Sequence, residues 1–257
     1  MTEPILQYYQ MGEGVTAFST TRQGGFSQGA FGQFNINPYC GDSEEAVGRN
    51  RQLLCQLLGI CDDRLLLPHQ VHLTGMAVVD QALLSHPAEA LEGMDALMTD
   101  VAGVCIGVST ADCIPVLLFD RAHRAVCAIH AGWRGTVQRI VGKAVGQMSA
   151  VYATRPADLF AQIGPGISLD SFEVGDEVYE AFASQAFPMD TISRRYDTGK
   201  WHIDLPLCNR QQLLSAGVPA THIAVSPVCT FRQCDTYFSA RRLGIHSGRI
   251  FTGILVE

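Results

Sequence analysis

The sequence predicts an α+β fold in which mixed β-sheets are covered by helices on the outside. Apolar runs of strand length, rich in β-branched residues, fill the middle of the chain between residues 96 and 130. Between such runs lie segments whose apolar residues recur at helical spacing, which predicts helices. Several strands are close enough in sequence to form hairpins, which disfavours a doubly wound parallel sheet.

The N-terminal quarter is predicted to hold a strand, a long loop and a helix. Within residues 14–42, apolar and polar residues first alternate, and Gly, Asn and Ser then become frequent. This pattern predicts a strand that leads into a turn-rich loop. The helix that follows is capped by Asp42 or Ser43 and ended by Gly59. Its apolar positions are Leu53, Leu54, Leu57 and Leu58.

The other elements follow in order along the chain. Residues 65–79 predict two short strands around a proline and a glycine, residues 96–130 predict a sheet, and residues 132–152 predict a helix with one apolar stripe. After it we expect strands within residues 159–167, 201–206, 223–231 and 249–257, and helices within residues 174–187 and 206–218.

The composition suits one soluble domain that spans residues 1–257. Of the 257 residues 47% are hydrophobic and 17% are charged, with no linker and no internal repeat. The formal charge is -7 and the basic residues are scattered, which argues against a nucleic-acid partner. There is no leader-like segment and no apolar run of about 20 residues, which argues against a membrane partner. We expect a cytoplasmic monomer or small homo-oligomer that acts on a small-molecule substrate.

The nine cysteines are predicted to be reduced thiols, most of them in the core. No C-x-x-C pair occurs, which disfavours a zinc ribbon and a thioredoxin-like site. Cys229 and Cys234 are separated by four residues with no matching pair, so we interpret them as core or loop thiols. A functional cysteine therefore acts alone or together with histidine.

A predicted hairpin brings one such cysteine to a histidine. Residues 120–123 join two apolar runs and are few enough for an antiparallel hairpin. If the loop is centred between Arg121 and Ala122, Cys113 lies directly opposite His130, with Cβ atoms about 4.5–5.5 Å apart. A loop of odd length would shift the register by one residue and place the two side chains on opposite faces.

A thiol that faces an imidazole has two chemical uses, as an activated nucleophile or as a metal ligand. His72 is the best candidate for a third ligand. On a strand, His69 and His72 point to opposite faces, so only one of them faces the site. The alternative interpretation is that these are ordinary residues of a β-rich core. Asp112 either orients a histidine or caps a turn.

Three motifs resemble the YfiH, or laccase-domain, family, whose members are also described as peptidoglycan editing factors. They are HQVH at residues 69–72, ADCIP at 111–115 and HAGWRG at 130–135. Shorter matches, among them IGPGI from residue 163 and FSARR from residue 238, extend the similarity over nearly the whole chain. Leu73 departs from the family, in which Gly is common at this position.

The resemblance implies a mixed α/β layered sandwich, similar to cysteine-dependent deamidating toxins, and a catalytic zinc site formed by His72, Cys113 and His130. It also implies a purine nucleoside phosphorylase that acts on adenosine, inosine, guanosine and methylthioadenosine and that deaminates adenosine. Phosphorolysis requires bound phosphate, for which we predict Arg22 and Arg242, and the Arg241–Arg242 pair and Arg249 are further candidates for anion binding. Asn35 is predicted to hydrogen-bond the base or the ribose.

Three alternatives remain open. The family is also described as multicopper polyphenol oxidases, and two histidines with one cysteine are the ligands of blue-copper sites. The eight histidines, without an H-x-H pair, argue against a full multicopper cluster. A second alternative is an amidase that edits UDP-muramoyl amino acid cell-wall precursors with the metal or with a Cys113 nucleophile. The third is a non-catalytic binding protein in which a fourth ligand closes the metal site.

Overall fold

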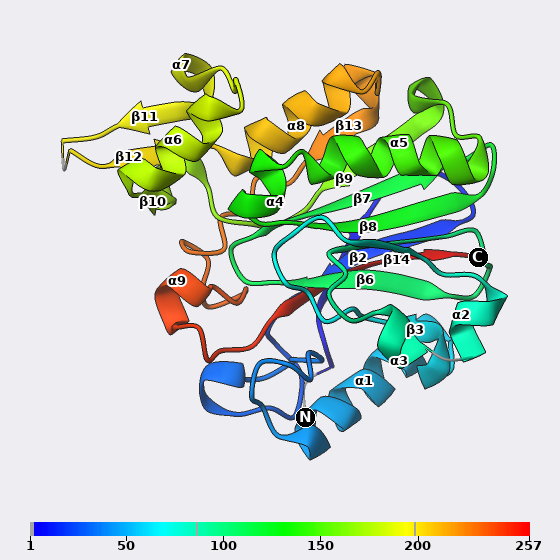
Figure 1. Cartoon of the computed structure of the whole chain (residues 1–257). Coiled ribbons are helices and arrows are strands. Elements are labelled where there is room, and N and C mark those ends of the chain that lie inside the picture. The colour runs from blue at the N-terminus through cyan, green and yellow to red at the C-terminus, as the bar shows by residue number, and fades with distance from the viewer. Residues whose placement is uncertain (1–2, 86, 198) are drawn as a thin grey trace.

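The computed structural model describes residues 3–85, 87–197 and 199–257, and two β-sheets packed face to face form its centre (Figure 1). The first sheet has the order β1-β2-β14-β6-β3 and the second the order β13-β9-β7-β8-β5-β4. The strands of the first sheet are β1 (Leu6–Tyr9), β2 (Val15–Thr20), β3 (Leu65–Leu66), β6 (Cys105–Thr110) and β14 (Ile250–Val256). Those of the second are β4 (Met76–Val78), β5 (Ala96–Thr99), β7 (Ile114–Asp120), β8 (Ala125–Ala131), β9 (Leu159–Ile163) and β13 (Ile223–Val225).

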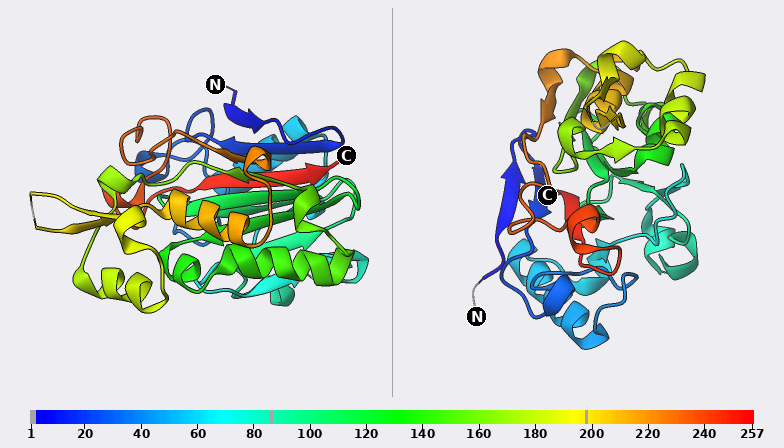
Figure 2. Two further views of the ribbon diagram at one scale, coloured as in Figure 1. Left: turned by 90° about the horizontal axis from the view of Figure 1, so that it is seen from above. Right: turned by 90° about the vertical axis from the view of Figure 1, so that its left-hand side faces the viewer.

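A small third sheet of order β10-β12-β11 extends from one end of the molecule (Figure 2). Its strands are β10 (Glu173–Val174), β11 (Ser193–Arg195) and β12 (Trp201–Ile203). The α-helices are α1 (Glu44–Leu58), α2 (Gln81–Ser85), α3 (Pro87–Ala90), α4 (Trp133–Val137), α5 (Ile140–Tyr152), α6 (Asp176–Ser184), α7 (Met189–Ile192), α8 (Leu205–Ser215) and α9 (Ala240–Leu243). Short 3-10 turns connect several of these elements.

The two large sheets and their helices form four layers, as predicted for a mixed sandwich with helices outside. Ile106 and Ile254 of the first sheet pack between the sheets against Leu117 and Val126 of the second. The outer face of the second sheet is covered by α5 and α8. The outer face of the first sheet is covered by α1, with Leu54 in this core. Both faces of each large sheet are therefore buried, which accounts for the nearly continuous apolar character of β6, β7 and β8.

The structure confirms the predicted ends of the first helix, α1, and corrects two other predictions. Ser43, one of the two predicted caps, accepts a hydrogen bond from the main-chain N–H of Ala46 (3.4 Å), and Gly59 ends α1 with a φ of 67°. The helix predicted over residues 132–152 is divided into α4 and α5 because Arg139 adopts a left-handed conformation with a φ of 61°. Strand β1, which pairs with β2, is absent from the predicted elements.

No helix among the described residues combines the length and the apolar character needed to cross a membrane.

Candidate metal centre

The hairpin of β7 and β8 brings Cys113 and His130 close together. Its register corrects the prediction, since His130 lies opposite Pro115 and not opposite Cys113. The cause is the turn: β7 continues through Asp120, so residues 121–124 form the connection. The register has moved by two residues, and a shift of two keeps every side chain on the same face. Cys113 is therefore a diagonal neighbour of His130, still within reach of it.

His72 lies in the loop between β3 and β4, where its φ of 63° is left-handed. The prediction that His69 and His72 share a strand is therefore wrong, because this segment forms only an isolated bridge between His69 and Glu92. One of the two histidines nevertheless joins the site. His69 instead contacts the Glu92 carboxylate through Nδ1 (2.7 Å), and its ring stacks on Tyr39 at 4.4 Å between centroids.

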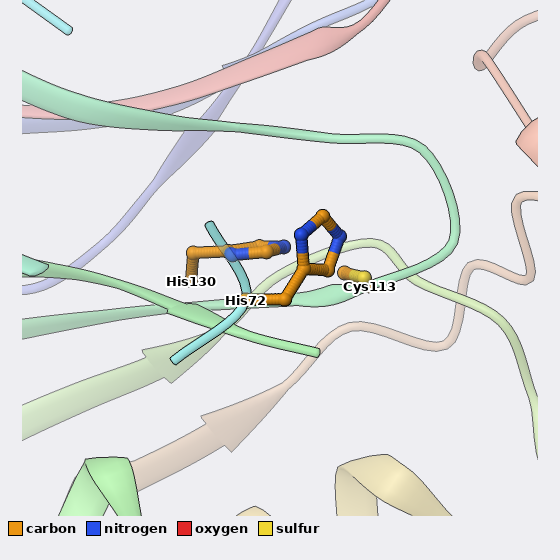
Figure 3. A group of neighbouring side chains, drawn as sticks. All are labelled: His72, Cys113 and His130. Carbon is orange, nitrogen blue, oxygen red and sulfur yellow. The ribbon is translucent and has the colours of Figure 1, made fainter. Parts of the chain in front are cut away.

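His72, Cys113 and His130 form a cluster of potential ligands (Figure 3). Their ligand atoms all lie within 4.8 Å of one another. The two imidazole rings meet edge to face, with centroids 4.7 Å apart. His130 is buried, Cys113 is partly buried and His72 is exposed, so the cluster opens toward solvent on one side. Within the described part of the chain, no fourth His, Cys, Asp or Glu joins it.

Gly132 leaves room for the cluster at the point where β8 turns into α4. A Cβ atom at this position would lie 3.0 Å from the Cys113 sulfur, 3.2 Å from Cδ2 of His72 and 3.7 Å from Cε1 of His130. The first two distances are shorter than ordinary van der Waals contacts. The glycine of the HAGWRG motif is therefore explained by the three side chains that converge on it.

Asp95, which is absent from the predicted site residues, holds two residues of the cluster in place. Its carboxylate is fully buried and accepts a hydrogen bond from Nδ1 of His130 (2.7 Å). It also accepts hydrogen bonds from the main-chain N–H groups of His72 (3.0 Å), Leu73 (2.8 Å) and Val71 (3.3 Å). With its proton on Nδ1, His130 presents Nε2 as a ligand. One carboxylate thus positions two of the three ligands.

The charges of the cluster favour a thiolate at Cys113. Burial raises the pKa of this thiol, but the imidazoles of His130 and His72 lower it by more, to about 6. Burial lowers the pKa of His130, but Cys113 and Asp95 raise it by more, to about 9. The thiolate is the form of cysteine that binds a metal ion. Two imidazoles and one thiolate fit a zinc or copper ion.

The cluster lies in the wall of a pocket of about 330 Å³. The rest of the wall comes from the loop after β2, from the segment before His72, from the end of β6, and from the start of α9 and the loop between α9 and β14. The residues that line the pocket are Asn37, Tyr39, Cys40, His69, Gln70, His72, Ser109, Thr110, Ala111, Cys113, His130, Ala240, Ile245 and Arg249. A single cavity therefore combines metal ligands, an aromatic ring and hydroxyl groups.

The two arginines predicted to bind phosphate hold loops outside this wall. The guanidinium of Arg22 donates hydrogen bonds to the main-chain oxygens of Gly32 (2.9 Å) and Cys234 (2.7 Å). Arg242 is exposed, and its guanidinium lies over the ring of Phe231 at 5.3 Å. Neither residue lines the pocket.

Asn35 and Asp112 stand behind the wall. Asn35 is fully buried, and its side-chain oxygen accepts a hydrogen bond from the main-chain N–H of Arg249 (3.1 Å), which does line the pocket. Asp112 accepts hydrogen bonds from the Thr230 hydroxyl and from the main-chain N–H of Arg241, both at 2.7 Å. Asp112 therefore orients loops and does not contact a histidine of the cluster. The residue that orients a histidine is Asp95.

Comparisons with known proteins agree with this architecture. The sequence model of a family described as multi-copper polyphenol oxidoreductase laccase matches residues 16–257. A purine nucleoside phosphorylase of Bacteroides thetaiotaomicron is 48% identical over 95% of this chain and 92% of its own. Adenosine deaminase RL5, from an unknown prokaryotic organism, is 44% identical over 97% of each chain. The crystal structure of YlmD from Geobacillus stearothermophilus, 33% identical, superposes with a TM-score of 0.89 over 95% of this chain and 93% of that one.

Proposed function

The chain belongs to the YfiH, or laccase-domain, family, and on this premise we propose that it is a zinc-dependent purine nucleoside phosphorylase that also deaminates adenosine. Phosphorolysis converts a purine nucleoside and phosphate into the free base and ribose-1-phosphate. Deamination converts adenosine and water into inosine and ammonia. Relatives that the alignment covers over nearly their full length are named for each of these activities.

One observation carries the proposal: His72, Cys113 and His130 offer three ligand atoms within 4.8 Å in the wall of a pocket. Three protein ligands with an open position are typical of catalytic rather than structural zinc sites. A zinc ion held there would supply a bound water with a pKa lowered to about 7, a nucleophile for C6 of adenine. Asp95 holds the His130 ring and the His72 main chain in place.

Phosphorolysis also needs a phosphate at C1′ of the ribose. Arg22 and Arg242 remain our predicted phosphate-binding residues, and Asn35 remains our predicted partner of the base or ribose. Arg249 is a further candidate for binding phosphate because it lines the pocket. Its guanidinium already donates to main-chain oxygens of Ser247 and Ile245, so it would offer phosphate its charge and its remaining N–H groups.

A defined set of incubations tests the proposed function. Protein stripped of metal and reloaded with one equivalent of Zn²⁺ or Cu²⁺ is incubated with adenosine, with and without phosphate, and the products are separated by chromatography. We expect inosine without phosphate, and adenine together with inosine and the hypoxanthine formed from it when phosphate is present. The proposal is wrong if the zinc-loaded protein forms neither product. Parallel incubations with a UDP-muramoyl amino acid and with a phenol identify the amidase and the copper oxidase.

A further inference from the structure

Two hydroxyl groups at the end of β6 have no hydrogen-bond partner. Ser109 and Thr110 are 5% and 1% exposed, and both line the pocket that contains the metal ligands. Their side-chain oxygens, Oγ and Oγ1, are buried without a partner in the structure. Buried hydroxyls are normally paired, because a buried polar group without a hydrogen bond destabilises the fold. The hydroxyls of Ser109 and Thr110 therefore do not contribute to the stability of the fold, which favours a role in binding.

The main chain around these hydroxyls is fully engaged. Thr110 pairs with Ile250 of β14. On the other side of β6, the Gln70 side chain donates to the main-chain oxygen of Ser109 (2.9 Å) and accepts from its N–H (2.7 Å). The strand is thus held in place on both sides while its two hydroxyls remain unused. Thr110 is the last residue of β6, so the strand ends at the pocket, and both Ser109 and Thr110 line it.

We infer that Ser109 and Thr110 bind the hydroxyl groups of the ribose of the substrate, an inference that rests on the proposed function. A neutral hydroxyl both donates and accepts hydrogen bonds, as a sugar hydroxyl does. Phosphate only accepts and is better matched by a guanidinium or by main-chain N–H groups. A purine base binds through its flat faces to aromatic rings, and the pocket provides Tyr39 stacked on His69 for this purpose.

Access to the ligand requires a small local change. Each hydroxyl oxygen is shielded in this structure, and rotation about χ1 moves it between staggered positions without any change in the backbone. The bond to a sugar hydroxyl then supplies the missing partner. A pocket built to pair with a hydroxyl rejects an analogue that lacks this group, because its own polar atoms are left unpaired. The zinc-loaded protein should therefore prefer ribonucleosides to deoxyribonucleosides.

The test compares Thr110→Val and Ser109→Ala with the wild type on adenosine, 2′-deoxyadenosine and 3′-deoxyadenosine. We expect kcat/KM for adenosine to fall about tenfold in each variant. The value for at least one deoxy analogue should change little, so that the preference for the ribonucleoside shrinks. Adenosine binding, measured by calorimetry, should weaken to a similar degree. Thr110→Ser keeps the hydroxyl and should retain most of the preference.

Thermal unfolding separates this role from a structural one. Because neither hydroxyl has a partner in the fold, Thr110→Val and Ser109→Ala should not lower the Tm. Tyr152→Phe is the matched control, since the hydroxyl of Tyr152 is also buried without a partner but lies at the end of α5, outside the pocket wall. It should leave every kcat/KM unchanged.

Two results overturn the inference. One is a set of variants whose preference for adenosine over both deoxy analogues equals that of the wild type. The other is a loss of activity that accompanies a drop in Tm of several degrees. A wild-type protein that neither binds nor turns over adenosine would overturn the proposed function itself, and the ribose assignment with it. The wild-type measurement therefore distinguishes the two failures.

Discussion

At the scale of single residues, the candidate site depends on one carboxylate as much as on its three ligands. Asp95 is fully buried and contacts both His130 and the main chain of His72. No local pattern in the sequence marks it, because its partners lie 22 to 35 positions away in the chain. His72 likewise has no spacing signature: the sequence offers it as one of two histidines in HQVH, and its role as a ligand depends chiefly on the family resemblance. Cys113 and His130, by contrast, are paired by the hairpin that their sequence predicts.

Asp95→Asn should weaken zinc binding by about 10- to 100-fold. An amide has only one acceptor oxygen, so it would either lose the hydrogen bonds from Leu73 and Val71 or present an N–H group to Nδ1 of His130 and move the ring proton to Nε2, the atom that would bind the metal. Competition with a chromophoric chelator measures the change. The control is Asp120→Asn, since Asp120 is also a buried aspartate that contacts a histidine Nδ1 (2.8 Å), but in the distant β7–β8 turn. Equal losses of affinity in both variants would contradict the role of Asp95.

Cys113→Ala should abolish stoichiometric zinc binding and lower adenosine turnover by at least a hundredfold, because two imidazoles alone hold the ion weakly. Metal analysis of the purified protein and the turnover assay check both effects, and the exposed Cys61 provides the control, Cys61→Ala. Unchanged turnover with a lowered Tm would show that the metal is structural. Full activity of the metal-free wild type would instead point to Cys113 as a nucleophile.

At the scale of elements, local signals predict where elements lie better than how they pair. Ser43, one of the two predicted caps, begins α1 in the structure, and Gly59 ends it as predicted. The β7–β8 hairpin is predicted with the correct faces, but its register is displaced because Asp120 belongs to β7. The break at Arg139 has no counterpart in the apolar stripe that runs through α4 and α5. Register and helix breaks depend on tertiary contacts that a one-dimensional pattern does not contain.

Gly132→Ala, at the junction of β8 and α4, should weaken zinc binding without unfolding the protein. The added Cβ would press on the Cys113 sulfur at 3.0 Å and on His72 at 3.2 Å, and both ligands would have to move. Chelator competition measures the loss. Gly142→Ala is the matched control, because its Cβ would meet open space within α5. It should leave affinity unchanged and stabilise the helix by about 0.5–1 kcal/mol. Equal affinities in both variants would contradict the steric argument.

The β7–β8 turn should contribute a stability that depends on pH. The Asp120 carboxylate accepts hydrogen bonds from the main-chain N–H groups of Ala122 (2.9 Å) and His123 (3.2 Å) and contacts the His123 ring. Burial raises the pKa of Asp120, but hydrogen bonds lower it by more, below its ordinary value. A carboxyl with a lowered pKa stabilises the fold above its unfolded-state pKa, and this stability is lost as the pH falls through its folded-state pKa.

Asp120→Asn should accordingly lower the free energy of unfolding by about 1 kcal/mol at pH 7. Urea unfolding of the variant and the wild type, repeated at decreasing pH, measures the difference. The two proteins should converge in acid, where the wild-type carboxyl is protonated. A difference that stays constant from pH 7 into the acid range would show that the charge of Asp120 is not its cause.

At the scale of the whole molecule, the core between the two large sheets links the ends of the chain. Ile254 of the last strand and Ala17 of the second pack in it with Leu117 and Val126 from the middle of the sequence. We propose that residues 1–257 fold as one domain. Metal-free protein should unfold in a single transition followed alike by near-UV and far-UV circular dichroism, and zinc should raise its midpoint. Two separate transitions would contradict the single domain.

The brevity of β3 has a consequence for association between molecules. This strand is only two residues long, so among the described residues most of the outer edge of β6 has no strand beside it. An open edge invites a strand from another chain, and proteins blunt such edges to avoid aggregation. The Gln70 amide occupies the donor and acceptor of Ser109 that a foreign strand would need. The segment that carries His72 therefore also covers the part of this edge where another chain would otherwise pair with Ser109.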